Sequence, residues 1–514
     1  MLLDRCGSTP PALRVWLNDN RSGDSVWKSA TIRATQAARL CLCAVTYPRR
    51  LAEQQPARCL AAYLLLMLAR LTTALFRPID NAWLIVARLV VGVLLALEMA
   101  GSLALGYSRE YTEPKFHFSY LFFDWLPHWS PPIIVALHLG AMAAGVAMAA
   151  GWRFRWAAGV LALCYTLLFL AEQTRFINHF YLYCLVAAML ALMPAHRAAS
   201  ADVRAGRVAP AGTTPAWTRY LLLFQMSVVY FFAGLAKLNS DWLMARPLMV
   251  WLAPKATYPL IGGLLGSDGL PWVMSYAGVA FDLLVVPLLL WRRTRPWAFG
   301  AAAFFHLSNV LVFGLGTFPW FSLLITAALF FPPDWPRHTP YLRRWVAARV
   351  PLPAAAAPTV VPRRAPVLLA GLGLYALVQL LVPLRHFLYP GDVHWTEEGH
   401  HFAWHMMLRA KSGSVSYRVV LPDGRTETVF PGQYLTPRQV GKLIGQPDCI
   451  LQFAHFLAAD YARRGLGPVA VYADSQVQLN RRPSRPIVAP TVNLAAQPRT
   501  LGLYPWITPT PPLR

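Results

Sequence analysis

Residues 217–241 read WTRYLLLFQMSVVYFFAGLAKLNSD, an apolar segment of membrane length with a lysine, Lys237, near its end. About 20 apolar residues span the hydrocarbon core of a bilayer as a helix, so this stretch predicts a transmembrane helix. A lysine in hydrocarbon costs roughly 2.5–3.5 kcal/mol on insertion scales. Lys237 therefore either extends its ammonium to the membrane surface or has a function, and a desolvated lysine that gives up its proton is a candidate general base.

The composition extends this interpretation to the whole chain of 514 residues. Hydrophobic residues make up 56% and charged residues only 14%, which indicates a polytopic membrane protein rather than several soluble domains. The net charge of +24 does not indicate nucleic acid binding, because the basic residues lie in loops between apolar runs, without a face of base-stacking aromatics. The seven cysteines predict neither a disulfide framework nor a zinc site.

Apolar segments follow one another from Phe76 onward, and most of them have Trp or Phe at an edge, as interfacial anchoring predicts. We expect about nine spans: Trp83–Leu105, Ile133–Ala150, Trp156–Leu170, Phe180–Met193, Trp217–Leu238, Trp272–Trp291, Trp297–Phe313, Phe318–Phe331 and Val367–Leu384. The predicted fold is mainly α, a helical membrane bundle over residues 76–385. A basic N-terminal extension, residues 1–75, precedes it, and its short apolar run Cys59–Leu71 suits either an interfacial helix or a leader.

Arginine-rich loops follow the even-numbered spans, whereas the other loops are balanced or nearly uncharged. The basic residues are Arg153, Arg155, Arg197, Arg204, Arg207, Arg292, Arg293, Arg295, Arg337, Arg343, Arg344, Arg363 and Arg364. The positive-inside rule then predicts a cytoplasmic N-terminus and a C-terminal region on the outer face. Alanine- and arginine-rich usage favours a bacterial plasma membrane as the location.

Residues 386–514 have the composition of a small extramembrane α+β domain. Ser416–Leu421 and Thr426–Phe430 alternate around a Pro-Asp-Gly-Arg turn and predict a hairpin. Thr436 is a suitable N-cap before Pro437, a second helix is expected from Pro447 to Arg464, and Val469–Leu479 predicts a strand. The chain beyond Pro483 is proline-rich, which favours an extended course.

Polar residues of three spans fall at one depth in this topology. Asn178 and His179 begin the fourth span, Lys237 ends the fifth, and His306 with Asn309 occupies one face of the outer half of the seventh. A polar pocket at the end of an apolar bundle suits an amphiphile with a polar head and an apolar tail. An amine and imidazoles there could deprotonate an acidic head group.

Each of these residues also has a purely structural interpretation. Lys237 can extend to the interface, His179 can cap a helix, and His306 can bond a carbonyl in the core. Asp282, in the middle of the sixth span, must be protonated or paired with a cation. A metal interpretation of four C-terminal histidines lacks an HxxxH helix or a carboxylate partner, so we expect no metal; they are His394, His400, His401 and His405.

Several ordered motifs are similar to those of one family. They are Asn178 to Tyr183, Tyr230 to Trp242, His306 with Asn309 and Phe318, His386-Phe387, Trp395-Thr396, Trp404 to Met407 and Asp423 to Thr426. With these residues in this order, the chain resembles the vitamin K-dependent gamma-carboxylase family, within the wider horizontally transferred transmembrane (HTTM) group.

The resemblance implies an integral membrane enzyme that oxygenates reduced vitamin K, a hydroquinone, to its epoxide. The energy released yields a strong base that removes a γ-proton from a protein glutamate, and CO2 then adds. Lys237 is the implied catalytic base. The residues implied to bind the quinol are Asn178, His179, His306 and Asn309. Trp395, His400 and Trp404 fall in the region linked to glutamate. The implied reactants are reduced vitamin K, O2 and CO2 without a metal; the implied partners are membrane lipid, the quinol and a Glu-containing protein.

Departures from the animal enzymes keep three hypotheses open. Gly399-His400 replaces a Leu-Tyr pair linked to glutamate handling, Phe456 stands where one disulfide cysteine is found, and the chain ends at Arg514 without the long additional lumenal region. These changes leave the quinol half intact and the carboxylation half open. The first hypothesis is a vitamin K epoxidase with or without carboxylation. The second is a non-catalytic quinone- or lipid-binding membrane protein, and the third a membrane scaffold or transporter part in which Lys237 only reaches the interface.

Overall fold

The computed structural model describes residues 56–353 and 358–513. The long apolar helices are α3 (Pro56–Phe76), α4 (Ala82–Ala104), α5 (Pro131–Ala150), α6 (Phe154–Leu170), α7 (Asn178–Leu192), α9 (Trp217–Ala236), α13 (Leu270–Leu290), α14 (Arg295–Phe313), α15 (Phe318–Phe330) and α18 (Ala365–Leu384). Short helices connect them: α8 (Ala201–Arg204), α10 (Ser240–Leu243), α11 (Arg246–Leu252), α12 (Gly262–Leu265), α16 (Trp335–His338) and α17 (Arg343–Arg349).

Each of the predicted spans is a helix in the structure, and a small strand-containing region follows them, so the predicted fold class is confirmed. Six described helices are long and apolar enough to cross a membrane, namely α4, α5, α9, α13, α14 and α18. The helices α6, α7 and α15 are apolar but shorter, so the number of crossings stays a prediction. The run predicted at Cys59–Leu71 belongs to the longer helix α3, whereas residues 1–55 of the predicted extension lie outside the described residues.

The contacts divide the chain into two compact units. The smaller contains residues 1–80, 212–220 and 352–374, and in its described part β1 (Pro78–Asp80) pairs antiparallel with β2 (Thr213–Pro215). The larger contains residues 81–211, 221–351 and 375–514, and therefore holds both the main part of the bundle and the C-terminal region. The domain boundaries predicted at residues 75 and 385 stay predictions.

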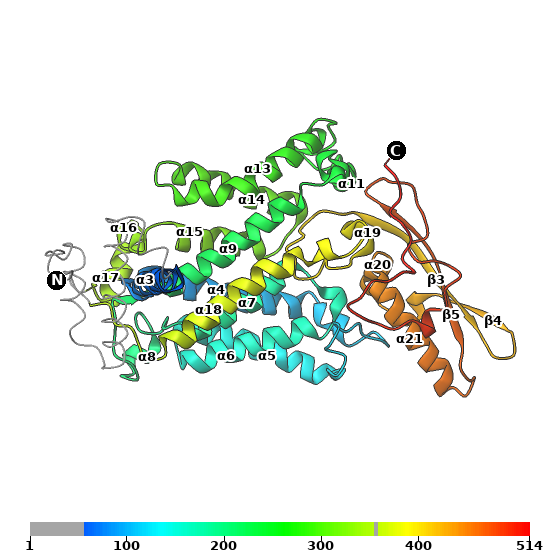
Figure 1. Cartoon of the computed structure of the whole chain (residues 1–514), viewed down its shortest axis with the longest axis horizontal. Coiled ribbons are helices and arrows are strands. Elements are labelled where there is room, and N and C mark those ends of the chain that lie inside the picture. Colours follow the sequence, from blue (N-terminus) through cyan, green and yellow to red (C-terminus); the bar gives the residue numbers. More distant parts are fainter. Residues whose placement is uncertain (1–55, 354–357, 514) are drawn as a thin grey trace. The chain divides into compact units, whose positions relative to one another are not determined.

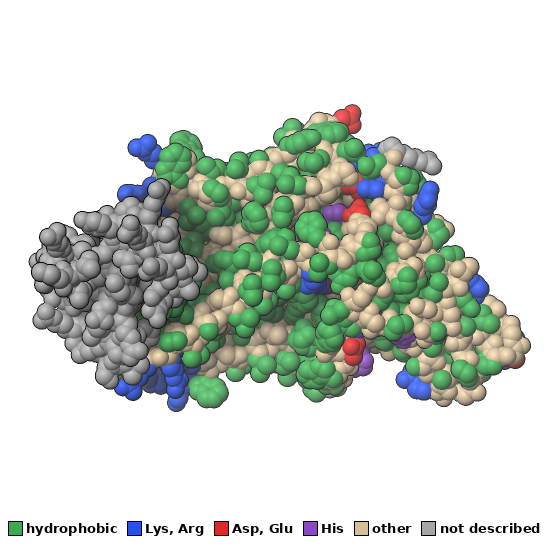
Figure 2. Space-filling model, in the orientation of Figure 1, with side chains coloured by type: hydrophobic (Ala, Val, Ile, Leu, Met, Phe, Trp, Pro, Cys, Tyr) green, Lys and Arg blue, Asp and Glu red, His purple; other side chains and the backbone are tan. Residues whose placement is uncertain are grey.

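Glycine allows α4 and α5 to pack closely within the larger unit (Figure 1). A Cβ on Gly92 would lie 2.6 Å from the carbonyl oxygen of Gly145, and a Cβ on Gly145 would lie 2.8 Å from the carbonyl oxygen of Gly92. Small residues at such contacts are typical of membrane helices, because backbone approach and dispersion replace the hydrophobic effect there. Along α13 and α14, by contrast, hydrophobic side chains cover the surface (Figure 2), as lipid-facing helices require.

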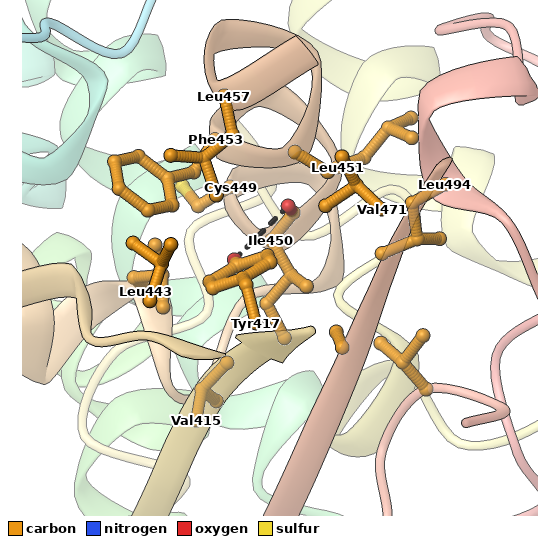
Figure 3. Packing of buried hydrophobic residues seen from close by; sticks show 14 of the residues in the cluster. Val415, Tyr417, Leu443, Cys449, Ile450, Leu451, Phe453, Leu457, Val471 and Leu494 are labelled. Carbon is orange, nitrogen blue, oxygen red and sulfur yellow. Dashed lines mark hydrogen bonds between the residues drawn. The ribbon is translucent and has the colours of Figure 1, made fainter. Parts of the chain in front are cut away.

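The C-terminal region contains α19 (Val393–Thr396), β3 (Lys411–Val420), β4 (Thr426–Val429), α20 (Pro437–Leu443), α21 (Pro447–Arg463) and β5 (Ala470–Leu479). The predicted hairpin forms, with Tyr417 opposite Val429, and β5 pairs antiparallel with the other edge of β3. Buried side chains of α21 and the sheet form the core, in which the hydroxyl of Tyr417 donates to the carbonyl oxygen of Ile450 at 3.1 Å (Figure 3).

Side-chain hydrogen bonds anchor this region to the bundle. Gln439 of α20 donates to the carboxylate of Glu172 at 3.0 Å, and Thr436 with Gln439 completes the predicted N-cap as a capping box. Gln452 of α21 donates to Gln173 at 2.7 Å. Because Glu172 and Gln173 lie between α6 and α7, these bonds hold α20 and α21 beside the first residues of α7.

We predict that Gly92→Ala lowers the free energy of unfolding by about 1–3 kcal/mol, because the added methyl group forces α4 and α5 apart. Gly101→Ala on the same helix is the matched control, since a Cβ there meets no atom within 4 Å. Thermal unfolding of both variants in one detergent measures the difference. Equal stability of the two variants would contradict the close helix contact.

Candidate functional site

Lys237 follows directly after α9, and its ammonium lies inside the protein. The residue is only 5% exposed. Its Nζ donates to Oδ2 of Asp282 at 2.6 Å and to the carbonyl oxygen of Ala233 at 3.2 Å, and it lies 5.2 Å from the ring centre of Trp242. Lys237 and Asp282 therefore form a buried ion pair, and the ammonium does not extend to the protein surface.

Local structure brings the two charges together. A Cβ on Gly234 of α9 would lie 2.7 Å from Leu283 and 3.1 Å from Asp282, so the missing side chain allows α13 to approach. Asn239 ends the segment by capping α10, because its Oδ1 accepts from the amide of Trp242 at 3.0 Å. A buried pair is tolerated when each charge has a partner and further hydrogen bonds.

A cavity of about 120 Å³, here called the first cavity, lies against this ion pair. Most of its wall is apolar, formed by methionine, phenylalanine, tryptophan, leucine and valine side chains. The polar residues that line it are Tyr230, Lys237, Asp282, His306, Asn309 and Ser322. The hydroxyl of Tyr230 is 2.9 Å from Nε2 of His306, so these two residues form a second polar pair on the wall.

The residues predicted for a single pocket are only partly together. Lys237, His306 and Asn309 line the first cavity. The half-buried ring of His179 stacks on Phe318, a wall residue, with centroids 4.9 Å apart, so His179 lies one ring away from this cavity. Asn178 lines a different cavity, where its Nδ2 donates to the carbonyl oxygen of His405 at 2.8 Å and its Oδ1 has no partner among the described residues.

This second cavity has a volume of about 620 Å³ and a wall rich in polar groups. Its wall consists of the residues before and at the start of α7, the loop that follows α19, and α20 with its C-terminal end. Trp251 and Met407 line both cavities. The bundle cavity and the polar cavity are therefore neighbours with a shared wall.

Positive charge dominates the second cavity. Glu397 is the one carboxylate among the described residues that line it, and its Oε1 accepts from Nε of Arg409 and Nζ of Lys411, each at 2.6 Å. Burial would raise the pKa of Glu397, but Arg409 and Lys411 hold this pKa below its ordinary value. Arg438 and Lys442 complete the cationic wall, and burial lowers the pKa of Lys442 to about 8.

The loop between α19 and β3 has an unusual backbone. Glu397, Phe402, Trp404 and Met407 have positive φ angles of 63°, 62°, 60° and 53°, a conformation that non-glycine residues rarely adopt. Such strain concentrates where a fold must place particular side chains. Gly399 also has a positive φ, and a Cβ there would lie 2.7 Å from the backbone of His386, so this loop conformation excludes a leucine at that position.

The three residues predicted for the glutamate region have different surroundings. His400 lines the second cavity. Trp395 is fully buried in the core of the C-terminal region, and its Nε1 donates to the carbonyl oxygen of Thr508 at 2.8 Å. Trp404 is fully buried and stacks on Tyr181 with centroids 4.9 Å apart. Within the described residues, no group of three His, Cys, Asp or Glu side chains is arranged to hold a metal ion.

Sequence reasoning missed Tyr230 and the cations of the second cavity. Tyr230 was detectable, because it precedes Lys237 by seven residues, about two helical turns, and so shares its face. The cations had no local signal. Arg409 and Lys411 lie at the start of a strand and Lys442 on a short helix, and only the tertiary fold places them around one space.

These features define a polytopic membrane protein that holds a buried amine–carboxylate pair between an apolar cavity and a cationic one. The HTTM domain model matches residues 76–335, and the model described as vitamin K-dependent gamma-carboxylase, lumenal domain, matches residues 364–512. The chain belongs to the vitamin K-dependent gamma-carboxylase family. Membership suggests a carboxylase-like function and implies the use of reduced vitamin K and of a glutamate-containing protein substrate. No solved structure matches the chain at a significant level.

We predict that Asp282→Leu destabilises the protein by about 3–5 kcal/mol, because it leaves the Lys237 ammonium buried without its counter-ion. The double variant Lys237→Met, Asp282→Leu removes both charges and is expected to recover most of this stability. Unfolding midpoints of the wild type, both single variants and the double variant, compared as a double-mutant cycle, measure the coupling. Additive effects would contradict a direct ion pair.

Proposed function

We propose that this protein is a vitamin K-dependent gamma-glutamyl carboxylase, which oxygenates reduced vitamin K in the first cavity and carboxylates a protein glutamate in the second. The observation that carries this proposal is the wall shared by the two cavities, formed by Trp251 and Met407. Because the two cavities adjoin at these residues, a base generated in the first cavity lies next to a substrate held in the second.

The lining of the first cavity fits a hydroquinone with an apolar tail. The apolar walls suit the ring system, whereas the polar groups provide hydrogen-bond partners for two ring oxygens. We assign one oxygen to Lys237 and Asp282, and the other to the Tyr230–His306 pair and Asn309. His179 supports the wall through its stacking on Phe318.

When bound, reduced vitamin K with O2 supplies a strong base at the expense of its own oxidation to the epoxide. Lys237 starts this chemistry by taking a proton from a hydroxyl group of the quinol. Its amine can do so only after releasing its own proton, and the carboxylate of Asp282, at 2.6 Å, is the nearest acceptor. Asp282 also orients the amine and balances its charge whenever the proton returns.

The cations of the second cavity suit an acidic substrate. Arg409 and Lys411 already share Glu397, whereas no described carboxylate lies within ion-pair distance of Lys442. A glutamate side chain brings one negative charge, and carboxylation adds a second on the same carbon. The ammonium of Lys442 therefore stabilises the doubly charged product more strongly than the singly charged substrate.

We further propose that the N-terminus is cytoplasmic and the C-terminal region faces outward across a bacterial plasma membrane. The arginines in the loops after α7 and α13, on the side opposite the C-terminal region in the predicted topology, support this orientation. The second cavity then receives its protein substrate from the outer side.

We predict that Lys237→Ala lowers epoxide formation at least about 100-fold, because a positioned base contributes factors of this size. The assay supplies reduced vitamin K, O2, labelled CO2 and a Glu-containing peptide to sealed vesicles of known sidedness, and follows both epoxide and labelled peptide. Lys115→Ala, an exposed lysine outside both cavities, is the matched control. The charge-free Lys237→Met, Asp282→Leu variant must lose activity as well, which separates loss of the base from loss of folding.

Full epoxide formation by a folded Lys237→Ala protein would contradict the catalytic role. Epoxide without labelled peptide in the wild type would limit the function to the epoxidase half. Quinol binding without epoxide would instead support a non-catalytic quinone-binding protein. Labelled peptide formed only in inside-out vesicles would reverse the proposed orientation.

We predict that Lys442→Gln raises the KM for the Glu-containing peptide about tenfold, the range expected for one lost hydrogen bond to a charged group. The pKa of Lys442 is about 8, so its positive charge is present at pH 7 and is lost as the pH rises through 8. The wild-type KM should therefore rise between pH 7 and pH 9, and Lys442→Arg should reduce this rise. An unchanged pH dependence in Lys442→Arg would contradict the assignment.

A further inference from the structure

The chain between α11 and α13 exposes a group of large apolar side chains. Residues 256–266, here called the apolar loop, read ATYPLIGGLLG and contain no charged residue. Tyr258, Leu260, Ile261 and Leu264 are exposed, and Leu260 is fully exposed. A single exposed leucine needs no explanation, whereas several exposed apolar side chains in one short segment mark a surface that binds a partner. The proposed chemistry does not use this surface.

The backbone of the apolar loop is tightly folded. A Cβ on Gly262 would lie 2.3 Å from the carbonyl oxygen of Ala256, and the amide of Gly262 donates to the carbonyl oxygen of Tyr258 at 2.9 Å. Leu260 has a positive φ angle of 66°, a conformation that is costly for a leucine. Because the side chain of Leu260 is fully exposed, no packing within the described part of the chain compensates for this cost. The loop therefore presents apolar side chains outward by its own folded shape, which indicates a partner outside the chain.

The apolar loop continues a surface that faces lipid. It ends four residues before α13, one of the described helices that are long and apolar enough to cross a membrane. Trp272, Val273 and Tyr276, in the first two turns of α13, are exposed. Lys255 precedes the loop, and its Nζ lies 5.0 Å from the ring centre of Tyr258 and donates to that hydroxyl at 3.2 Å. A lysine and a tyrosine at the edge of an apolar surface are typical of the membrane–water interface, so lipid is the partner that this surface fits.

The segment that carries the apolar loop also forms part of the first cavity. Leu248 and Trp251 of α11 line this cavity, and α11 packs against α13 (Figure 1). The ring of Trp251 meets Phe313 of α14 edge-on, with centroids 6.2 Å apart, and Nζ of Lys255 lies 6.0 Å from the centre of the Phe313 ring. Residues 252–255 therefore join the cavity wall directly to the apolar loop.

The apolar loop lies toward the C-terminal region. Nδ2 of Asn480 donates to Asp241 of α10 at 3.0 Å, so α10 and the adjoining α11 lie at the end of the bundle that meets this region. We propose that the apolar loop inserts into the membrane leaflet at this end, and that the quinol enters the first cavity from the lipid beside it. The inference rests on the proposed function, which places the quinol in that cavity. A quinol with an apolar tail dissolves in lipid, so this route brings its head group to the cavity while the tail stays in an apolar environment.

Photo-crosslinking of the full protein in lipid vesicles tests the insertion without an assay of activity. Leu260 is replaced by the photoreactive residue benzoylphenylalanine, and the adducts are identified by mass spectrometry. We expect adducts with phospholipid. The same replacement at Asp423, in the exposed turn between β3 and β4, is the matched control and should give none. A crosslink from position 260 to a second copy of the chain, or the absence of a lipid adduct at that position, would overturn the insertion.

Quinol kinetics test the entry route. The double variant Leu260→Glu, Leu264→Glu places two carboxylates in the loop, which withdraw it from lipid. In the epoxide assay, kcat/KM for membrane-dissolved vitamin K hydroquinone should fall about tenfold with kcat nearly unchanged, because at limiting quinol this ratio depends on how fast the quinol reaches the cavity. For a hydroquinone without a tail, which dissolves in water, kcat/KM should stay as in the wild type. Leu501→Glu adds a carboxylate at an exposed leucine of the C-terminal region, and as the control it should change neither ratio.

The two hydroquinones separate lost access from a damaged cavity. A ratio that falls equally for both would overturn the entry route, because it indicates that the cavity itself has changed. An unchanged ratio for the membrane-dissolved hydroquinone would overturn the route as well. A wild type that forms no epoxide would refute the proposed function and with it the entry of a quinol, whereas a lipid adduct at position 260 would still establish the insertion.

Discussion

The ion pair between Lys237 and Asp282 is the constraint on which the rest of the site depends. Two opposite charges in an apolar bundle are tolerable only at contact distance, and this requirement fixes the separation and rotation of α9 and α13. Gly234 provides the space for that approach, and the capped turn at Asn239 places Trp242 beside the ammonium. The first cavity lies against this pair, with α14, α15 and residues of α11 completing its wall.

The two cavities differ because their walls come from different kinds of structure. Membrane helices contribute apolar side chains with a few polar groups, whereas the C-terminal region contributes the cations of β3 and α20. The loop between α19 and β3 joins them, and its left-handed residues show that the backbone is held there by the surrounding fold rather than by local preference. Hydrogen bonds from α20 and α21 to the segment between α6 and α7 keep this arrangement together.

Local sequence patterns predicted most of the helices and strands. Apolar length and aromatic edges located every long helix from α4 to α18, and the turn between β3 and β4 and the cap before α20 marked elements of the C-terminal region. The candidate site was predicted in part, because helix depth placed Lys237, His306 and Asn309 in one layer. Depth does not specify rotation, so it could not show that Asn178 faces the second cavity while His179 packs behind Phe318.

The sequence by itself determined the membrane bundle, the presence of a small α+β region after it, and the need for a partner for Asp282, because each of these follows from local composition or from the cost of an isolated charge. Only the tertiary structure decided which cation pairs with Asp282 and that two cavities share Trp251 and Met407. These contacts join residues far apart in the chain, and their geometry depends on helix rotation and close packing, which no local pattern specifies.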